Sequence, residues 1–118
     1  MKEKPLLFIL LLSISLAFGQ KRVIDSLNQL MRNTNNDTMR LVISERLSFE
    51  WLNSNSDSSL LYADQYLKLS EKLEYRMNEA DALRLAAFNY TYTGNYPRAL
   101  EKLYRALKTC PDKREDNK

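Results

Sequence analysis

The spacing of the apolar residues after residue 20 is the strongest constraint on how this chain can fold. They recur every three or four positions, which places them on one face of an α-helix. The pattern holds in five segments: residues 21–32, 38–52, 59–73, 79–93 and 96–109. No segment alternates with a period of two for long enough to form a strand. The sequence therefore predicts an all-α fold of antiparallel helices joined by short turns.

Short polar segments separate these helices and hold the residues that start them. Residues 33–37 and 53–58 are rich in Asn, Asp and Ser, whose side chains accept hydrogen bonds from the free N–H groups at a helix start. The expected N-caps are Asp37 or Thr38 for the second helix and Asp57 or Ser58 for the third. Residues 74–78 contain no strong breaker, so we expect only a short connection there.

The N-terminal residues have the pattern of a secretory signal peptide. Residues 6–18 carry no charge, and this run is shorter than the ~20 apolar residues that span a membrane. Ala17 and Gly19 place small side chains three positions and one position before a cleavage site that precedes Gln20. We therefore expect residues 1–19 to be removed and the mature protein to be exported, to the periplasm. An uncleaved anchor and an ordinary buried segment are the alternatives.

Several classes of chemistry are excluded by composition. The chain has no histidine and one cysteine, Cys110, which excludes His-dependent catalysis, an internal disulfide and a multi-Cys metal site. Two glycines are too few for a phosphate-cradling loop. A net charge of +3, spread along the chain, is weak support for nucleic-acid binding. We expect no catalytic residue, no metal, no cofactor and no nucleic-acid partner.

The helices after residue 37 repeat in pairs. Trp51 and Tyr90 are 39 residues apart, Ser59 and Ala99 are 40 apart, and these offsets superimpose two helical hairpins. The second hairpin carries small residues, aromatics, a glycine and a closing proline at regular positions. They are Ala87, Tyr90, Gly94, Tyr96, Ala99, Ala106, Leu107 and Pro111. Small residues allow close helix approach, Gly94 suits a left-handed turn, and Pro111 cannot continue a helix.

This pattern resembles the tetratricopeptide repeat. The resemblance implies a short α-solenoid with a lead helix and turn at 20–36, a degenerate hairpin at 37–75, a second hairpin at 76–111 and a charged tail at 112–118. It also makes Trp51, Tyr90 and Tyr96 packing residues, with Tyr96 filling the wedge beside the helices. The family's tryptophan is replaced by Leu83 and its second-helix aromatic by Leu103.

The lengthened first hairpin resembles the repeats of exported sensor and scaffold proteins of Bacteroidetes-type bacteria. This resemblance implies a non-catalytic protein-interaction module that binds a protein or peptide. The alternative is the sensory front end of a larger signal-transduction protein, with a histidine kinase or a DNA-binding regulator as output.

The resemblance also implies a concave binding face on the first helix of each hairpin. The residues that map to this face are Glu45, Phe49, Asp81, Arg84, Phe88 and Tyr92. Exposed aromatics with an arginine are typical of peptide recognition. The alternative is that Phe49 and Phe88 contact neighbouring repeats instead.

The last helix has apolar residues around more than one side. Leu100, Leu103, Tyr104 and Leu107 exceed what one packing face needs, so we expect some of them to face solvent or a partner. A homo-oligomer through this helix is one outcome; further repeats or marginal folding are the others. The basic residues Arg98, Lys102, Arg105 and Lys108 of the same helix fit an ordinary exposed face better than a phosphate-binding surface.

Overall fold

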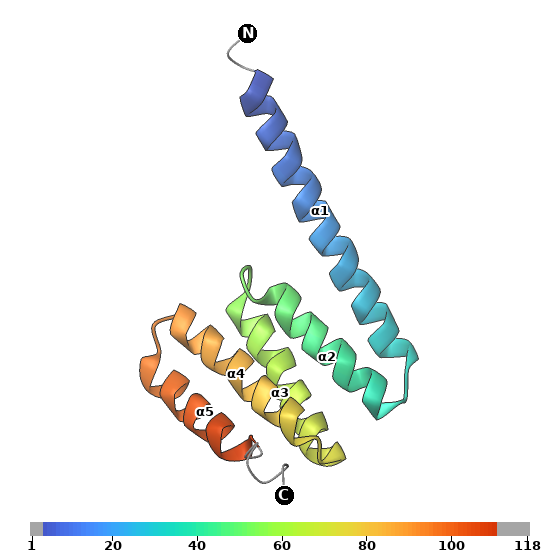
Figure 1. Cartoon of the computed structure of the whole chain (residues 1–118). Helices are drawn as coiled ribbons and strands as arrows, with labels where there is room; N and C mark the ends of the chain where they lie inside the picture. The colour runs from blue at the N-terminus through green and yellow to red at the C-terminus, as the bar shows by residue number, and fades with distance from the viewer. Residues whose placement is uncertain (1–3, 111–118) are drawn as a thin grey trace, which may run out of the picture.

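The computed structural model of the chain describes residues 4–110 and contains five helices. They are α1 (Lys4–Asn33), α2 (Asp37–Trp51), α3 (Ser56–Leu73), α4 (Arg76–Tyr92) and α5 (Tyr96–Thr109). Helices α2 to α5 form two antiparallel hairpins, and each helix packs against its predecessor in the sequence (Figure 1). No strand occurs within the described range. The all-α, repeat-like architecture is confirmed.

Helix α1 is longer than the sequence pattern predicted. A lead helix was expected at 21–32, but one continuous helix runs from Lys4 to Asn33 because Gly19 alone does not stop it. Its C-terminal half packs on α2 through Ile24, with Leu27 and Met31 beside it. Its N-terminal half, with exposed apolar side chains, stands clear of the hairpins (Figure 1).

The N-caps of α2 and α3 are asparagines rather than the predicted residues. Asn36 Oδ1 accepts from the N–H groups of Thr38 and Met39, at 2.9 and 3.3 Å. Asn55 Oδ1 accepts from the N–H of Ser58 at 3.1 Å. Helix α2 begins at Asp37 and α3 begins at Ser56. The residues predicted as N-caps therefore lie inside the first turn of each helix. The capping chemistry was predicted correctly, and the residues were wrong.

Left-handed residues end α3 and α4. Glu74 has φ of 59° and ends α3, so α4 begins at Arg76 rather than at residue 79 as predicted. Gly94 has φ of 83°, and the Asn95 N–H donates to the carbonyl of Tyr90 at 2.7 Å. This glycine turn was predicted, since glycine adopts positive φ at little cost. Pro111 and the charged tail lie outside the described residues.

Three apolar clusters hold the helices together. Leu41, Ala63, Tyr66, Ala82 and Leu85 join α2, α3 and α4. Ile24, Ile43 and Leu47 join α1 to α2, and Ala80, Leu83 and Ala106 join α4 to α5. Small side chains are buried at both hairpin crossings, as the repeat pattern predicted for Ala87 and Ala99; Ser48 and Ser59 are buried at the first crossing.

The aromatic packing residues were predicted only in part. Trp51 is half-buried and packs on the cluster between α1 and α2, and Tyr90 is also half-buried. Tyr96 is 61% exposed, so the prediction that it fills a wedge is wrong for the described part of the chain. It opens α5 at the outer edge of the last hairpin, beside which no further described helix packs.

Candidate functional site

The six residues predicted for a concave face lie on the first helix of each hairpin. Glu45 and Phe49 lie on α2; Asp81, Arg84, Phe88 and Tyr92 lie on α4. The three aromatic side chains are exposed, Phe88 by 53%, whereas Glu45 and Asp81 are half-buried. The aromatic rings are therefore available to a partner from outside.

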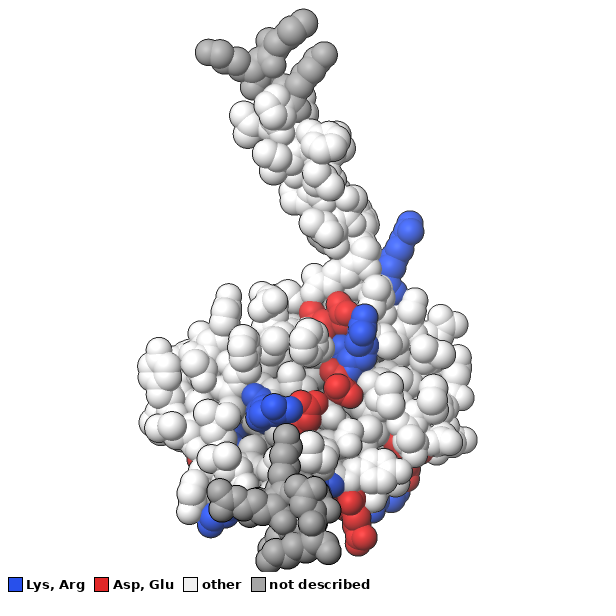
Figure 2. Space-filling view, in the orientation of Figure 1, with Lys and Arg blue, Asp and Glu red and all other residues white. Residues whose placement is uncertain are grey.

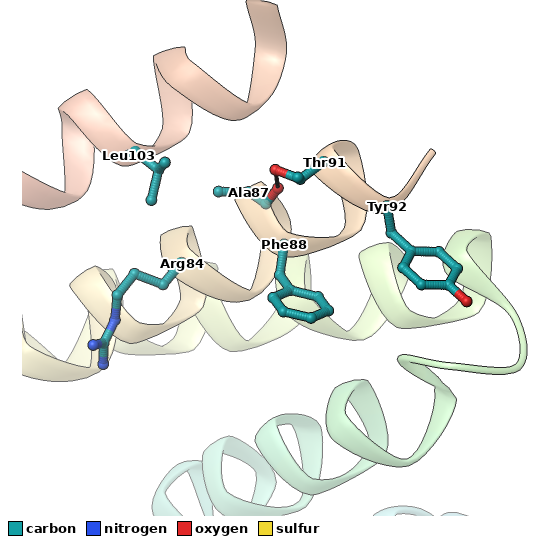
Figure 3. Close-up of a pocket in the computed structure, with 6 residues that line it drawn as sticks. All are labelled: Arg84, Ala87, Phe88, Thr91, Tyr92 and Leu103. Atoms are coloured by element: carbon teal, nitrogen blue, oxygen red, sulfur yellow. Dashed lines mark hydrogen bonds between the residues drawn. The ribbon is translucent and has the colours of Figure 1, made fainter. Parts of the chain in front are cut away.

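A pocket of about 570 Å³ follows the exposed side of α4. Arg84, Phe88 and Tyr92 are spaced four residues apart, so their side chains lie along one side of the helix (Figure 3). Leu103 of α5 closes the opposite wall, and the buried Ala87 forms part of the floor. A partner in this pocket would meet two aromatic rings, a leucine and one guanidinium group.

A second, smaller pocket of about 300 Å³ lies on α2. Phe49 and Val42 line it together with Glu45 and Arg46. Phe49 and Val42 are both exposed. Each pocket thus has an aromatic ring, an aliphatic side chain and an arginine, and Glu45 and Asp81 add an acidic group on each of the two first helices.

Polar side chains connect α3 to α4 beside this surface. Tyr66 of α3 donates from its hydroxyl to Asp81 Oδ2 at 3.1 Å and accepts from Asn78 Nδ2 at 3.1 Å. Asp81 Oδ1 accepts from the Arg84 guanidinium at 2.8 Å. Burial, with the Asp81 charge second, raises the pKa of the Tyr66 hydroxyl above its usual range, so it stays protonated and can donate.

Glu45 faces this polar cluster from α2. Burial raises the pKa of its carboxyl above the ordinary value, the Asp81 charge raises it further, and Arg46 opposes the shift. Two carboxylates from neighbouring first helices therefore lie within electrostatic reach of each other. Of these two carboxylates, Asp81 forms an ion pair with Arg84 of its own helix, and Glu45 forms none with the described residues.

Figure 2 shows how charge is distributed over this side of the molecule. Acidic and basic side chains form a narrow mixed band down the middle, between α2 and α4, and uncharged surface extends on both sides. A surface of this kind suits a partner that contributes apolar side chains as well as charged ones.

Sequence reasoning missed several residues of this surface. Tyr66 and Asn78 were not singled out, although they order Asp81. Val42 was missed as well, although its place one turn before Glu45 on the same helix could have revealed it. Tyr66 lies on α3, and the sequence alone does not show that its hydroxyl reaches Asp81 of α4.

The side chains that line these pockets are suited to binding a partner. No group of three or more metal-ligating side chains occurs among the residues that the structure describes. The candidate pockets are open surfaces with aromatic, aliphatic and paired charged side chains. They can hold a peptide by apolar contact and hydrogen bonds.

Stacked antiparallel hairpins, small residues at each helix crossing and a glycine turn define a tetratricopeptide-repeat protein. The chain matches the family model of the SusR N-terminal TPR domain over residues 19–114, and it belongs to that family. No curated protein and no solved structure matches the chain. TPR domains are generally non-catalytic protein-interaction modules, so the predicted class of function, a module that binds protein, is supported.

Proposed function

We propose that this chain binds a peptide segment of a partner protein on the surface formed by α2 and α4. The observation that carries the proposal is that exposed aromatic side chains line both pockets, Phe49 on α2 and Phe88 with Tyr92 on α4, beside charged groups. Contiguous exposed apolar patches mark interaction sites, and Tyr and Arg are enriched among the residues that contribute most to binding. Glu45, Asp81 and Arg84 would then set the orientation of the peptide.

Site-specific crosslinking in cells tests this proposal. A photoreactive amino acid at Phe88 should capture a partner, and the same group at Leu61, exposed on α3, serves as the matched control. Phe88→Ala together with Tyr92→Ala should abolish capture by a probe at Phe49. Equal capture at Phe88 and Leu61 would contradict a site on the first helices.

Export is the second part of the proposal. One helix of the described chain, α1, is long and apolar enough to cross a membrane, with a mean hydropathy of 1.7 over its most apolar window. A signal sequence near the N-terminus has the same property. We propose that residues 1–19 direct export to the periplasm and are cleaved before Gln20. Intact mass of the fractionated protein tests this, since a retained Met1 in the cytoplasm would overturn it.

The alternative role as the sensory front end of a signal-transduction protein uses the same binding surface. The family match concerns an N-terminal domain, which is compatible with output domains elsewhere in a longer protein. Sequencing the coding DNA downstream of Lys118 distinguishes the two roles. A membrane span followed by a kinase or DNA-binding domain would favour the sensory role.

Self-association through α5 is a third element of the proposal. Leu100, Tyr104 and Leu107 are more than 60% exposed, and Leu103 and Leu107 also line a pocket of about 400 Å³ between α4 and α5. Sedimentation of the purified chain measures whether this face pairs two copies. A stable monomer that binds no hydrophobic dye would contradict an uncovered apolar face.

A further inference from the structure

A pocket of about 290 Å³ lies where α1, α2 and α3 meet, away from the surface described above. Its lining residues are Met31, Arg40, Ser44, Gln65, Lys68 and Leu69. Two of them are cationic, none is acidic, and the remaining polar groups are an amide and a hydroxyl. Such a set of donors favours an anion over a cation or a neutral apolar molecule.

The repeat alignment explains why space is left at this position. The 39-residue offset that aligns Trp51 with Tyr90 also aligns Ser44 with Leu83. Leu83 is fully buried and packs with Ala80 and Ala106 between the helices of the second hairpin. The serine side chain has about two heavy atoms fewer than leucine, and the first hairpin therefore has a polar hydroxyl and a pocket where the second has a filled apolar core.

The Ser44 hydroxyl has no hydrogen-bond partner. Ser44 is completely buried, and its Oγ bonds to none of the described side chains or backbone groups. A buried polar group without a partner is costly and rare in native proteins, so its persistence at a pocket indicates a ligand or solvent oxygen.

Of the two cations, Arg40 is unpaired among the described residues, and Lys68 has an exposed ion pair that a ligand can replace. Arg40 is exposed and has no ion pair within 4.0 Å among the described residues. Asp37, whose pKa is lowered mainly by Lys72 and to a lesser extent by Arg40, bonds to Lys72 Nζ at 2.8 Å. Lys68 pairs with Asp64 at 2.9 Å on an exposed helix face, and such pairs are weak enough to exchange for a ligand.

We propose that this pocket binds a small oxyanion through the Ser44 hydroxyl and the Arg40 guanidinium, with Lys68 as the second cation. Met31 and Leu69 add apolar wall, which favours the carboxylate of a short organic acid over inorganic phosphate. Because Ser44 is fully buried, the ligand reaches its hydroxyl only when neighbouring side chains of the pocket move. This site is independent of the peptide surface on α2 and α4.

The test is an amide NMR titration of the full 118-residue chain, held in a mild detergent, with sodium butyrate and, separately, sodium phosphate. Sodium chloride at matched ionic strength is the blank. The expected result is a saturable shift at residues 40, 44 and 68, tighter for butyrate. Tighter binding of phosphate than of butyrate would support an oxyanion site but contradict its preference for a carboxylate. No saturable shift with either anion up to roughly tens of millimolar would overturn the site, since affinity weaker than this is negligible.

Variants separate a specific site from general attraction of anions. Arg40→Gln should weaken butyrate binding about tenfold, the effect of losing one charge-assisted hydrogen bond. Arg105→Gln, at an exposed arginine on α5 and outside the pocket, should leave affinity unchanged. Ser44→Leu should abolish binding by filling the pocket, and Ser44→Ala serves if that variant does not fold. Equal losses for Arg40→Gln and Arg105→Gln would overturn the proposal.

Discussion

Ser48 and Ser59 exchange hydrogen bonds where α2 crosses α3. Ser48 Oγ donates to the Ser59 carbonyl at 2.9 Å, and Ser59 Oγ donates to the Ser48 carbonyl at 2.7 Å. Asn89 of α4 adds a third element, since its Nδ2 donates to Ser59 Oγ at 2.8 Å. All three side chains are fully buried. The aligned crossing of the second hairpin has Ala87 and Ala99 instead, so the first crossing is joined by polar bonds and the second by apolar contact alone.

Ser59→Ala should lower the free energy of unfolding more than Ser48→Ala. Removal of the Ser59 hydroxyl leaves Asn89 Nδ2 with only its bond to the Leu85 carbonyl and deprives the Ser48 carbonyl of a donor. We expect a loss of ~2–3 kcal/mol for Ser59→Ala and ~1 kcal/mol for Ser48→Ala, measured by urea denaturation. Ser58→Ala, whose hydroxyl makes no described bond, is the control. The reverse order of losses would show that Asn89 finds another partner.

Ala99→Trp should loosen the second hairpin. Ala99 is 3% exposed and lies at the crossing of α4 and α5, where a larger side chain forces the helices apart. Overpacking of this kind costs ~1–3 kcal/mol or more, and thermal denaturation followed by circular dichroism measures it. Leu100→Trp places the same ring one position along, at an exposed site, and should leave Tm nearly unchanged. An unchanged Tm for Ala99→Trp would contradict the helix register.

The architecture could be predicted from the sequence because it depends on local signals that repeat. Apolar spacing set the helices, and the offset between Trp51 and Tyr90 set the hairpin pairing. The N-caps were misplaced because Asn36 and Asn55 stand next to Asp and Ser residues with the same capping chemistry. Sequence alone does not show which of several adjacent residues with similar capping propensity serves as the N-cap.

The surface chemistry was harder to predict because it depends on side chains from three helices. The six residues of the proposed peptide surface followed from the repeat positions, whereas the bonds of Tyr66 to Asp81 and Asn78 required the packing of α3 against α4. Tyr96 was misjudged for a related reason. A repeat pattern assumes a neighbouring helix, and no described helix packs on the outer face of α5.

Asn36→Ala should shorten or fray the start of α2. Asn36 Oδ1 satisfies two N–H groups that have no partner within the helix, and the loss of such a cap costs ~1 kcal/mol. Asn35→Ala, one residue earlier and exposed, should change stability little, since Asn35 makes no described bond. Hydrogen exchange at Thr38 and Met39 reports the fraying directly. Equal exchange rates in both variants would mean that Asp37 or Thr38 replaces the cap.

Glu45→Gln should stabilise the fold at neutral pH and have little effect in acid. Burial and the Asp81 charge raise the carboxyl pKa of Glu45 above its ordinary value of 4.5, so the folded state binds this proton more readily than the unfolded state. The carboxyl therefore lowers stability as the pH rises through the folded-state pKa, and glutamine removes that penalty.

Urea denaturation at pH 7 and at pH 3.5 measures this difference, with Glu101→Gln on the exposed face of α5 as the control. We expect the free energy of unfolding of Glu45→Gln to exceed that of the unsubstituted chain at pH 7 and to match it at pH 3.5, where the carboxyl is protonated in both states. If the substitution instead lowers stability at pH 7, the Glu45 carboxylate is stabilised by Arg46 more strongly than burial and Asp81 oppose it. In that case α2 and α4 would present two charged carboxylates side by side, and the proposed peptide surface would favour a basic residue between them.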